Sequence, residues 1–471
     1  MQLIPNEKLE RFFRNGFVLL AVLTFLSSII YVTASDIKEW DESRNGINAY
    51  EMLQRGSWLV PYYEGEVDTW NAKPPLFHWC IMLSYKLLGL SIFSMRLPSV
   101  LATMIFFLVF YRLMRRFTPP LTASLACMVL MSCKAVLGDH IGLTADFDSL
   151  LLLFLFLSVY AVVIYLQEGR RGAIIAAACF TGLAFWTKGA AGLILIPSIG
   201  FYLLWSKKQK VASPTIGSDL ILALLVLVVF ISTWILVSVN HISYDNPSMY
   251  GSNSQLETMW LHDVVKRLFL DDKGQFGTGH TWYFVFSALD TRMQLWSYVF
   301  FAVSIWLVFG VQKQLDAVQK NLLLISTLVI FPLGLLLTFS KNQHNWYLAP
   351  VYPFIAAVIA VGINKLIDHR MVFVLLMVVI PLQSIRQNHF LLTDRDEIPV
   401  SQGFAEIVKD KPVYYNQLPQ HLILKMVFMG AQPMKWKEDT NEKKVNALWI
   451  ESENEAIGQL GTIGKYNLLS K

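Results

Sequence analysis

The residues of this chain that are best suited to chemistry lie in two blocks near the N-terminus. The first is Asp41-Glu42-Ser43-Arg44, and the second is Asn71-Ala72-Lys73-Pro74-Pro75, with Trp70 and Trp79 nearby. Both blocks follow the first long apolar run, so we expect them at a membrane surface. A carboxylate pair can activate a hydroxyl group there, and an arginine and a lysine can bind a lipid phosphate. This combination predicts chemistry on a lipid-linked substrate.

The local sequence constrains how these side chains point. If the first block is helical, Arg44 lies on the same face as Asp41 and can pair with it or with a phosphate. Two prolines after Lys73 bar a helix before Leu76 and restrict the direction of the lysine. The alternatives are a solvated turn for the first block and ordinary snorkelling for the lysine.

A second acidic motif, Thr144-Ala145-Asp146-Phe147-Asp148-Ser149, opens a run of leucine and phenylalanine. Carboxylates at a helix N-terminus are favoured by the helix dipole, so capping is one reading of this motif. Two aspartates at the edge of the hydrocarbon exceed what a cap needs, and ionisable groups in membranes are functional candidates. The spacing of Asp146 and Asp148 also resembles a divalent-metal motif, although a lone motif of this kind is weak evidence.

Further cations are expected at the same membrane face. Arg96, Lys188 and Lys341 lie at the ends of apolar segments, and Tyr347 follows the last of them closely. Each cation alone reads as an interfacial anchor, but together with Lys73 they would form a ring suited to a polyprenyl phosphate. His262, in a long loop, could close over a substrate, and an ordinary surface histidine is the alternative.

Composition places the chain among polytopic membrane proteins. Of its 471 residues, 55% are hydrophobic and only 15% are charged, against about 25% charged residues in soluble proteins. The net charge of +5 comes from basic residues in short loops, which set membrane orientation and do not indicate nucleic acid binding. The four cysteines fall in apolar segments, so no disulfide or metal framework is visible.

Apolar segments long enough to span the bilayer predict an all-α protein with about eleven transmembrane helices. Leu76–Leu90 is short and carries His78 and Lys86, so we place it along the interface. Basic loops then fall on one side together with Lys8, Arg11 and Arg14, which puts the N-terminus in the cytoplasm. The eleven segments are 17–34, 96–113, 119–137, 149–166, 172–187, 189–205, 219–239, 294–311, 320–339, 346–364 and 371–386.

This topology divides the chain into two domains and gathers its polar residues. Residues 1–386 form the transmembrane domain, with extracytoplasmic loops at 35–95 and 240–293. Residues 387–471 have mixed polar composition, and strands predicted at 412–416 and 445–451 indicate a small extracytoplasmic α/β domain. The acidic motifs and the cations all fall on the side away from the cytoplasm, which predicts a single site there.

The motifs resemble those of the GT-C glycosyltransferases, and among them glycosyltransferase family 39. This family includes the protein O-mannosyltransferases and the bacterial aminoarabinose–lipid A transferase. The resemblance covers roughly residues 10–390. It rests on Asp41-Glu42-x-Arg44, Lys73-Pro74-Pro75, Phe93-Ser94-Met95-Arg96, Asp148-Ser149-Leu150-Leu151, Thr187-Lys188-Gly189 and Ser340-Lys341…Tyr347-Leu348-Ala349-Pro350.

The resemblance implies transfer of a sugar, with inversion, from a polyprenyl phosphate such as undecaprenyl phosphate to an acceptor outside the cytoplasm. The acceptor would be lipid A, a protein or a cell-envelope glycan, and the enzyme would lie in the inner membrane. It also implies Asp41 as general base, Glu42 and Asp148 as further acidic site residues, and Arg44 as support. Donor-phosphate contacts would come from Lys73, Arg96, Lys188 and Lys341, with Tyr347 as a pocket wall. No cofactor is expected, and a divalent metal is the alternative. Asp146 is the alternative to Asp148 as the second acidic residue.

The sequence leaves the sugar open and admits a rival class of protein. Trp70-Asn71-Ala72 departs from the aromatic-acidic residues expected before the lysine in the aminoarabinose branch, which argues against that donor. The rival is a lipid or sugar transporter or flippase. Such proteins place polar residues near the bilayer midplane, often in repeated broken helices, whereas here the acidic residues gather at one face.

Overall fold

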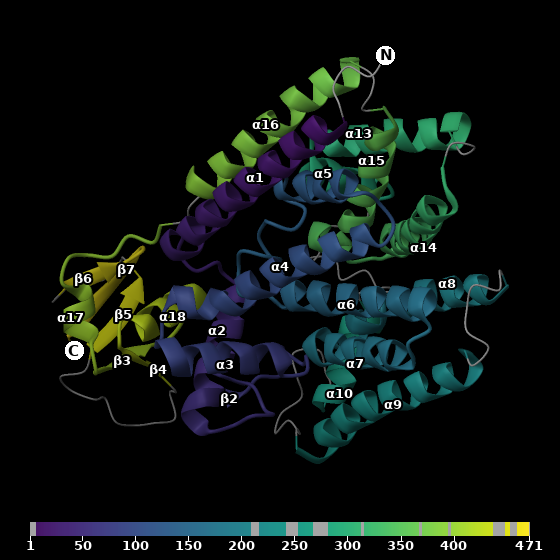
Figure 1. Cartoon of the computed structure of the whole chain (residues 1–471). Helices are drawn as coiled ribbons and strands as arrows, with labels where there is room; N and C mark the ends of the chain where they lie inside the picture. Colours follow the sequence, from purple (N-terminus) through teal and green to yellow (C-terminus); the bar gives the residue numbers. More distant parts are fainter. Residues whose placement is uncertain are drawn as a thin grey trace.

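The computed structural model describes most of the chain and is shown in Figure 1. The described residues are 6–208, 216–241, 253–266, 281–311, 315–366, 370–393, 397–436, 448–452 and 459–470.

Six helices in the described part are long and apolar enough to cross a membrane. A seventh span would be the bent pair of α12 (Phe284–Met293) and α13 (Leu295–Trp306), which η3 (Leu307–Val311) continues and which bends by 118°. The chain is therefore a multi-pass membrane protein. The six helices are α1 (Asn6–Ala34), α4 (Ile92–Arg115), α6 (Phe147–Glu168), α7 (Arg171–Lys188), α9 (Ile216–His241) and α14 (Ala317–Phe339).

Each of the eleven predicted apolar segments contains a helix, but not all are full spans. The shorter ones are α5 (Pro120–Met131), α8 (Ile196–Lys208), preceded by η1 (Gly189–Leu193), and α15 (Tyr352–Leu366). Figure 1 shows α16 (Arg370–Thr393) lying beside α1. The interfacial helix expected at Leu76–Leu90 is α3 (Leu76–Leu88), whose 13 residues reach only about 20 Å.

One predicted span ends early, and this positions the site. The segment expected at 119–137 stops being helical at Met131, and residues 132–146 form a largely buried loop that leads into α6. The segment between α1 and α3 holds the amphipathic helix α2 (Asp41–Arg55) and a hairpin of β1 (Tyr62–Tyr63) and β2 (Glu66–Val67). In the second large loop, the described helices are α10 (Gln255–Glu257) and η2 (Thr258–Lys266).

The C-terminal region forms the expected small α/β unit. Its sheet has the order β4-β3-β5-β7-β6, with β3 parallel to β4 and β5 and the remaining pairs antiparallel. Because α16 continues to Thr393, this unit begins after the predicted boundary at residue 386. Its elements are α17 (Phe404–Val408), β3 (Pro412–Tyr415), α18 (Gln420–Phe428), β4 (Gln432–Lys435), β5 (Leu448–Ser452), β6 (Gln459–Ile463) and β7 (Tyr466–Ser470).

The C-terminal unit packs against α2, the helix that begins with Asp41 (Figure 1). Lys425 of α18 forms an ion pair of 2.6 Å with Asp36, just before α2. Gly46 permits the close approach of the two helices, since a side chain there would collide with Leu424 and Met95. The start of α2 is therefore held from both sides, by the bundle and by the C-terminal unit.

Candidate functional site

Helix α2 is fastened to the start of α6, and this brings the two acidic motifs together. The Glu42 carboxylate accepts hydrogen bonds from the backbone N–H of Ala145 at 2.9 Å and of Lys38 at 2.8 Å. The side-chain amide of Asn45 donates to the carbonyl of Ala145 at 2.9 Å. These bonds place the residue before Asp146 against the first turn of α2.

Arg96 also holds α2 in place. Its contacts do not fit the phosphate-binding role that the sequence predicted for it. Its guanidinium donates to both oxygens of Glu42, at 2.6 and 2.7 Å, and to backbone carbonyls of Val32, Ser35 and Asp36. All five N–H groups are used and the side chain is fully buried, so none is free for a donor phosphate. Glu42 is equally enclosed, and we assign both residues to holding α2 against α6 and α1.

Arg44 forms an ion pair with a residue that the sequence did not indicate. It binds Asp68 through two hydrogen bonds of 2.8 and 2.7 Å and lies over the rings of Tyr63 and Trp70. Burial alone would raise the pKa of the Asp68 carboxyl, but the Arg44 guanidinium outweighs it and holds that pKa below its usual range. The same carboxylate accepts a hydrogen bond from the backbone N–H of Asn71. The side-chain oxygen of Asn71 accepts one from the Lys73 ammonium at 3.3 Å.

Asp68→Asn should lower the free energy of unfolding by about 3–5 kcal/mol at neutral pH, because Arg44 would remain as a buried charge without its partner. The lowered pKa of Asp68 means that its carboxylate stabilises the fold above about pH 4 and loses this effect as the pH falls further. The difference in thermal unfolding between wild type and variant should therefore be large at pH 7 and shrink below pH 4. Equal unfolding at pH 7 would contradict this role.

The second acidic motif holds a lysine at the wall of an apolar cavity. Both oxygens of Asp148 contact the Lys188 ammonium, at 2.7 and 2.6 Å. Lys188 also lies over the Tyr347 ring, and Lys73 lies over the rings of Trp70 and Phe147. A cavity of about 230 Å³ is lined by Asp148, Lys188, Tyr347 and Lys73, and its remaining walls are mostly apolar. The cavity thus combines a lipid-like interior with two ammonium groups.

A polar cavity of about 320 Å³ lies on the other side of the same motif. Its walls include Asp146, His140, Arg292 and Trp346. Asp146 precedes α6 without capping it through its side chain, so the capping interpretation does not hold for this residue. Since Asp146 and Asp148 are two residues apart, both cavities lie at the start of α6.

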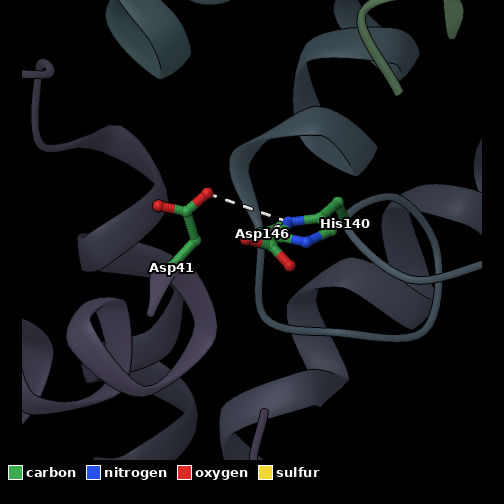
Figure 2. Close-up of side chains that lie close together, drawn as sticks. All are labelled: Asp41, His140 and Asp146. Carbon is green, nitrogen blue, oxygen red and sulfur yellow. Dashed lines mark ion pairs between the residues drawn. The ribbon is translucent and has the colours of Figure 1, made fainter. Parts of the chain in front are cut away.

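Figure 2 shows the side chains of Asp41, His140 and Asp146 close together. Its Nδ1 lies 3.8 Å from an oxygen of each. Burial by itself would lower the pKa of His140, but the Asp146 carboxylate, with weaker contributions from Asp41 and Asp148, raises it to about 9. The ring stacks on Trp346 with 3.9 Å between centroids, and the backbone has a φ of +64°, a conformation that costs energy for a non-glycine residue.

The sequence interpretation missed His140, Arg292 and Trp346. Arg292 is buried and donates to Asn345 and to the carbonyls of Lys134 and Asp139. A signal was present, because Asp139 and His140 are ionisable residues inside a mostly apolar stretch.

Two of the predicted site residues are not described as lining either cavity. Lys341 is half-buried and follows Ser340, which lines the apolar cavity, but its own side chain does not line it. The side chain of His262 lies outside the described residues. The remaining predicted residues, Asp41, Lys73, Asp146, Asp148, Lys188 and Tyr347, meet at one end of the helical bundle.

The residues of the two cavities could bind a phosphate and accept a proton. Two ammonium groups at the end of an apolar cavity, near the N-terminus of a 22-residue helix, provide a positive potential for a phosphate on a lipid chain. Carboxylates at the neighbouring polar cavity can accept a proton from a hydroxyl or similar group.

The fold is that of the GT-C glycosyltransferases. The crystal structure of ArnT from Cupriavidus metallidurans bound to undecaprenyl phosphate superposes with a TM-score of 0.71 at 14% identity, covering 97% of this chain and 98% of that one. The archaeal oligosaccharyltransferase AglB from Archaeoglobus fulgidus, in complex with an inhibitory peptide and a dolichol-phosphate, gives a TM-score of 0.58 at 11% identity, covering 89% of this chain and 64% of AglB.

Sequence comparisons confirm the resemblance to these transferases that the motifs predict. The family model described as dolichyl-phosphate-mannose-protein mannosyltransferase matches residues 72–235. An undecaprenyl phosphate-alpha-4-amino-4-deoxy-L-arabinose arabinosyl transferase from Pseudomonas paraeruginosa is 29% identical over 177 residues, 36% of this chain and 31% of that protein. A protein of the same name from Serratia proteamaculans is 30% identical over 37% of this chain and 32% of its own length. The match thus spans about a third of the length of these relatives.

Proposed function

We propose that this chain is a membrane glycosyltransferase that moves a sugar from a polyprenyl phosphate to an acceptor outside the cytoplasm. The observation that carries the proposal is the pair of cavities that meet at Asp146 and Asp148. One is apolar and ends in the ammonium groups of Lys73 and Lys188, and the other is polar and bordered by acidic residues. A lipid-linked donor and a polar acceptor need two such compartments next to each other.

In the proposed reaction, the donor phosphate lies at Lys188 and Lys73 while its lipid chain occupies the apolar cavity and the adjoining bilayer. Lys341 is a candidate for an additional phosphate contact. An acceptor oxygen or nitrogen in the polar cavity forms a bond to the anomeric carbon, and its proton passes to Asp41. The bond from that carbon to the phosphate oxygen breaks, and its electron pair leaves on the phosphate, which the two ammonium groups stabilise. Attack opposite the leaving group inverts the anomeric centre.

Asp148 acts through Lys188 in this scheme. Both of its oxygens contact the ammonium group, so it holds the cation at the cavity wall and does not take the acceptor proton. Asp41 remains as base because it begins α2 next to His140 of the polar cavity and about a third of its side chain is accessible, with an exposed fraction of 36%.

We also propose that the site faces away from the cytoplasm in a cell inner membrane. The support is the set of basic loops at the opposite ends of the helices, which follow the rule that lysine and arginine accumulate on the cytoplasmic side. The acceptor class proposed is a membrane lipid such as lipid A, a protein or an envelope glycan.

The test is a reconstituted assay that separates transfer from transport. The purified protein in lipid nanodiscs is mixed with polyprenyl phosphate sugars and with an envelope extract as acceptor, and free polyprenyl phosphate is followed by mass spectrometry. Transfer predicts release of polyprenyl phosphate and one sugar mass added to an acceptor. In proteoliposomes, movement of intact donor across the bilayer without any release would favour a flippase.

A further inference from the structure

The proposed base follows a residue in a rare backbone conformation. Trp40, which directly precedes Asp41, has a φ of +71° and a ψ of −114°. Bulky residues seldom adopt a positive φ, because the side chain then crowds the backbone. Such a conformation persists only where surrounding contacts impose it, and it occurs mostly at functional sites. Because α2 begins directly after Trp40, this conformation sets the direction of the first turn and of Asp41.

Helix α18 of the C-terminal unit contacts the segment between α1 and α2. Lys425 donates to Oδ2 of Asp36 at 2.6 Å and to the carbonyl of Ile398 at 2.9 Å. The same Asp36 oxygen accepts a hydrogen bond from the backbone N–H of Ile398 at 2.6 Å. One turn earlier on α18, Nδ1 of His421 lies 3.7 Å from a carboxylate oxygen of Glu39. The segment is thus held to α18 at both of its acidic residues.

A third contact from α18 reaches the first turn of α2 itself. In the amide orientation that satisfies both of its polar atoms, Gln420 donates to the carbonyl of Trp40 at 3.2 Å and accepts from the Arg44 guanidinium at 3.1 Å. The Trp40 carbonyl also accepts a hydrogen bond from the backbone N–H of Arg44 at 2.9 Å, which is the first hydrogen bond of α2. Gln420 therefore bridges the two ends of the turn that carries Asp41.

We propose that α18 positions the general base, with Gln420 and Lys425 as positioning residues for Asp41. This role rests on the proposed transferase function, in which Asp41 takes the acceptor proton, and it gives the C-terminal unit a part in transfer. None of the described residues of that unit lines either cavity, so its effect on transfer is indirect. A base must lie within hydrogen-bonding distance of the acceptor proton, and a displacement of about 1 Å can cost about 10²-fold in rate.

The test uses the full-length protein in nanodiscs. Gln420→Leu fills a similar space without either hydrogen bond, and Lys425→Met removes the ammonium group at Asp36. Each variant should lower the single-turnover rate of polyprenyl phosphate release at saturating donor by about tenfold. The affinity for the donor should stay at the wild-type value, because Lys73 and Lys188 are unchanged.

Two further variants separate positioning from general damage to the fold. Lys425→Arg retains the charge and the hydrogen-bond donors, so it should restore most of the rate. Lys435→Met is the matched control within the C-terminal unit. Lys435 pairs with Glu64 of the hairpin at 2.6 Å, away from the segment before α2, and the rate of this variant should match wild type.

Hydrogen exchange of residues 36–44, measured by mass spectrometry without donor or acceptor, reports the order of this segment independently of turnover. Exchange should be faster in Gln420→Leu and Lys425→Met than in wild type and Lys435→Met. Wild-type exchange and rate in both α18 variants, or an equal loss of rate in Lys435→Met, would overturn the proposal. A wild type that transfers no sugar would contradict the proposed function and this role with it, whereas full activity of both α18 variants beside an active wild type would contradict this role alone.

Discussion

Asp41→Asn should lower the rate of sugar transfer by about 10²–10⁴-fold, the contribution expected of a general base. An amide has nearly the same shape as the carboxylate but cannot take the acceptor proton. The start of α2 should stay in place, since Glu42 and Asn45 provide its contacts to the loop before α6. The measurement is the single-turnover rate of polyprenyl phosphate release in nanodiscs.

A matched control accompanies this variant. Glu51→Gln changes another carboxylate of α2, which accepts the backbone N–H of Gly65 and does not line either cavity, and its rate should match wild type. A rate for Asp41→Asn within about twofold of wild type would exclude Asp41 as the base.

Lys188→Met should reduce transfer by about 10²–10³-fold and should also destabilise the protein. The first effect is loss of a fixed charge at the leaving phosphate. The second arises because Asp148, only 7% exposed, would be left as a buried carboxylate without this lysine, at a cost of about 3–5 kcal/mol. Rates of polyprenyl phosphate release and thermal unfolding report the two effects separately.

The double variant Lys188→Met/Asp148→Leu distinguishes a catalytic contribution of the lysine from a purely structural one. Replacing both members of a buried ion pair by apolar residues is often neutral for stability. The double variant should therefore recover the unfolding temperature of wild type while transfer remains low. Recovery of both stability and transfer would mean that Lys188 only balances Asp148 and does not contact the donor.

Much of the helical framework follows from the sequence because apolar segments of span length are a strong, local signal. The eleven predicted segments all contain helices, and the short helix at Leu76 was also expected. The exception is the segment at 119–137, where hydropathy continues past Met131 although the helix ends. Residues 132–146 are buried as a loop, and hydropathy does not distinguish a buried loop from a buried helix.

For the candidate site, the sequence indicates which types of residue take part but not which residues contact one another. Arg96 and Lys188 look alike in sequence, since each is a cation near the end of an apolar segment. In the fold Arg96 is enclosed by Glu42 and three carbonyls, whereas Lys188 borders a cavity. Arg44 was expected to pair with Asp41 or a phosphate, yet it binds Asp68, because the hairpin between α2 and α3 brings Asp68 back to it. Such contacts depend on tertiary packing, which spacing along one helix does not encode.

The most direct test of the account is a cryo-electron microscopy structure of the protein in nanodiscs with a polyprenyl phosphate bound. We expect the phosphate within hydrogen-bonding distance of the Lys188 and Lys73 ammonium groups, with the lipid chain leaving through the cavity beside Tyr347. A phosphate bound at the opposite ends of the helices, or a lipid outside this cavity with both lysines unengaged, would contradict it.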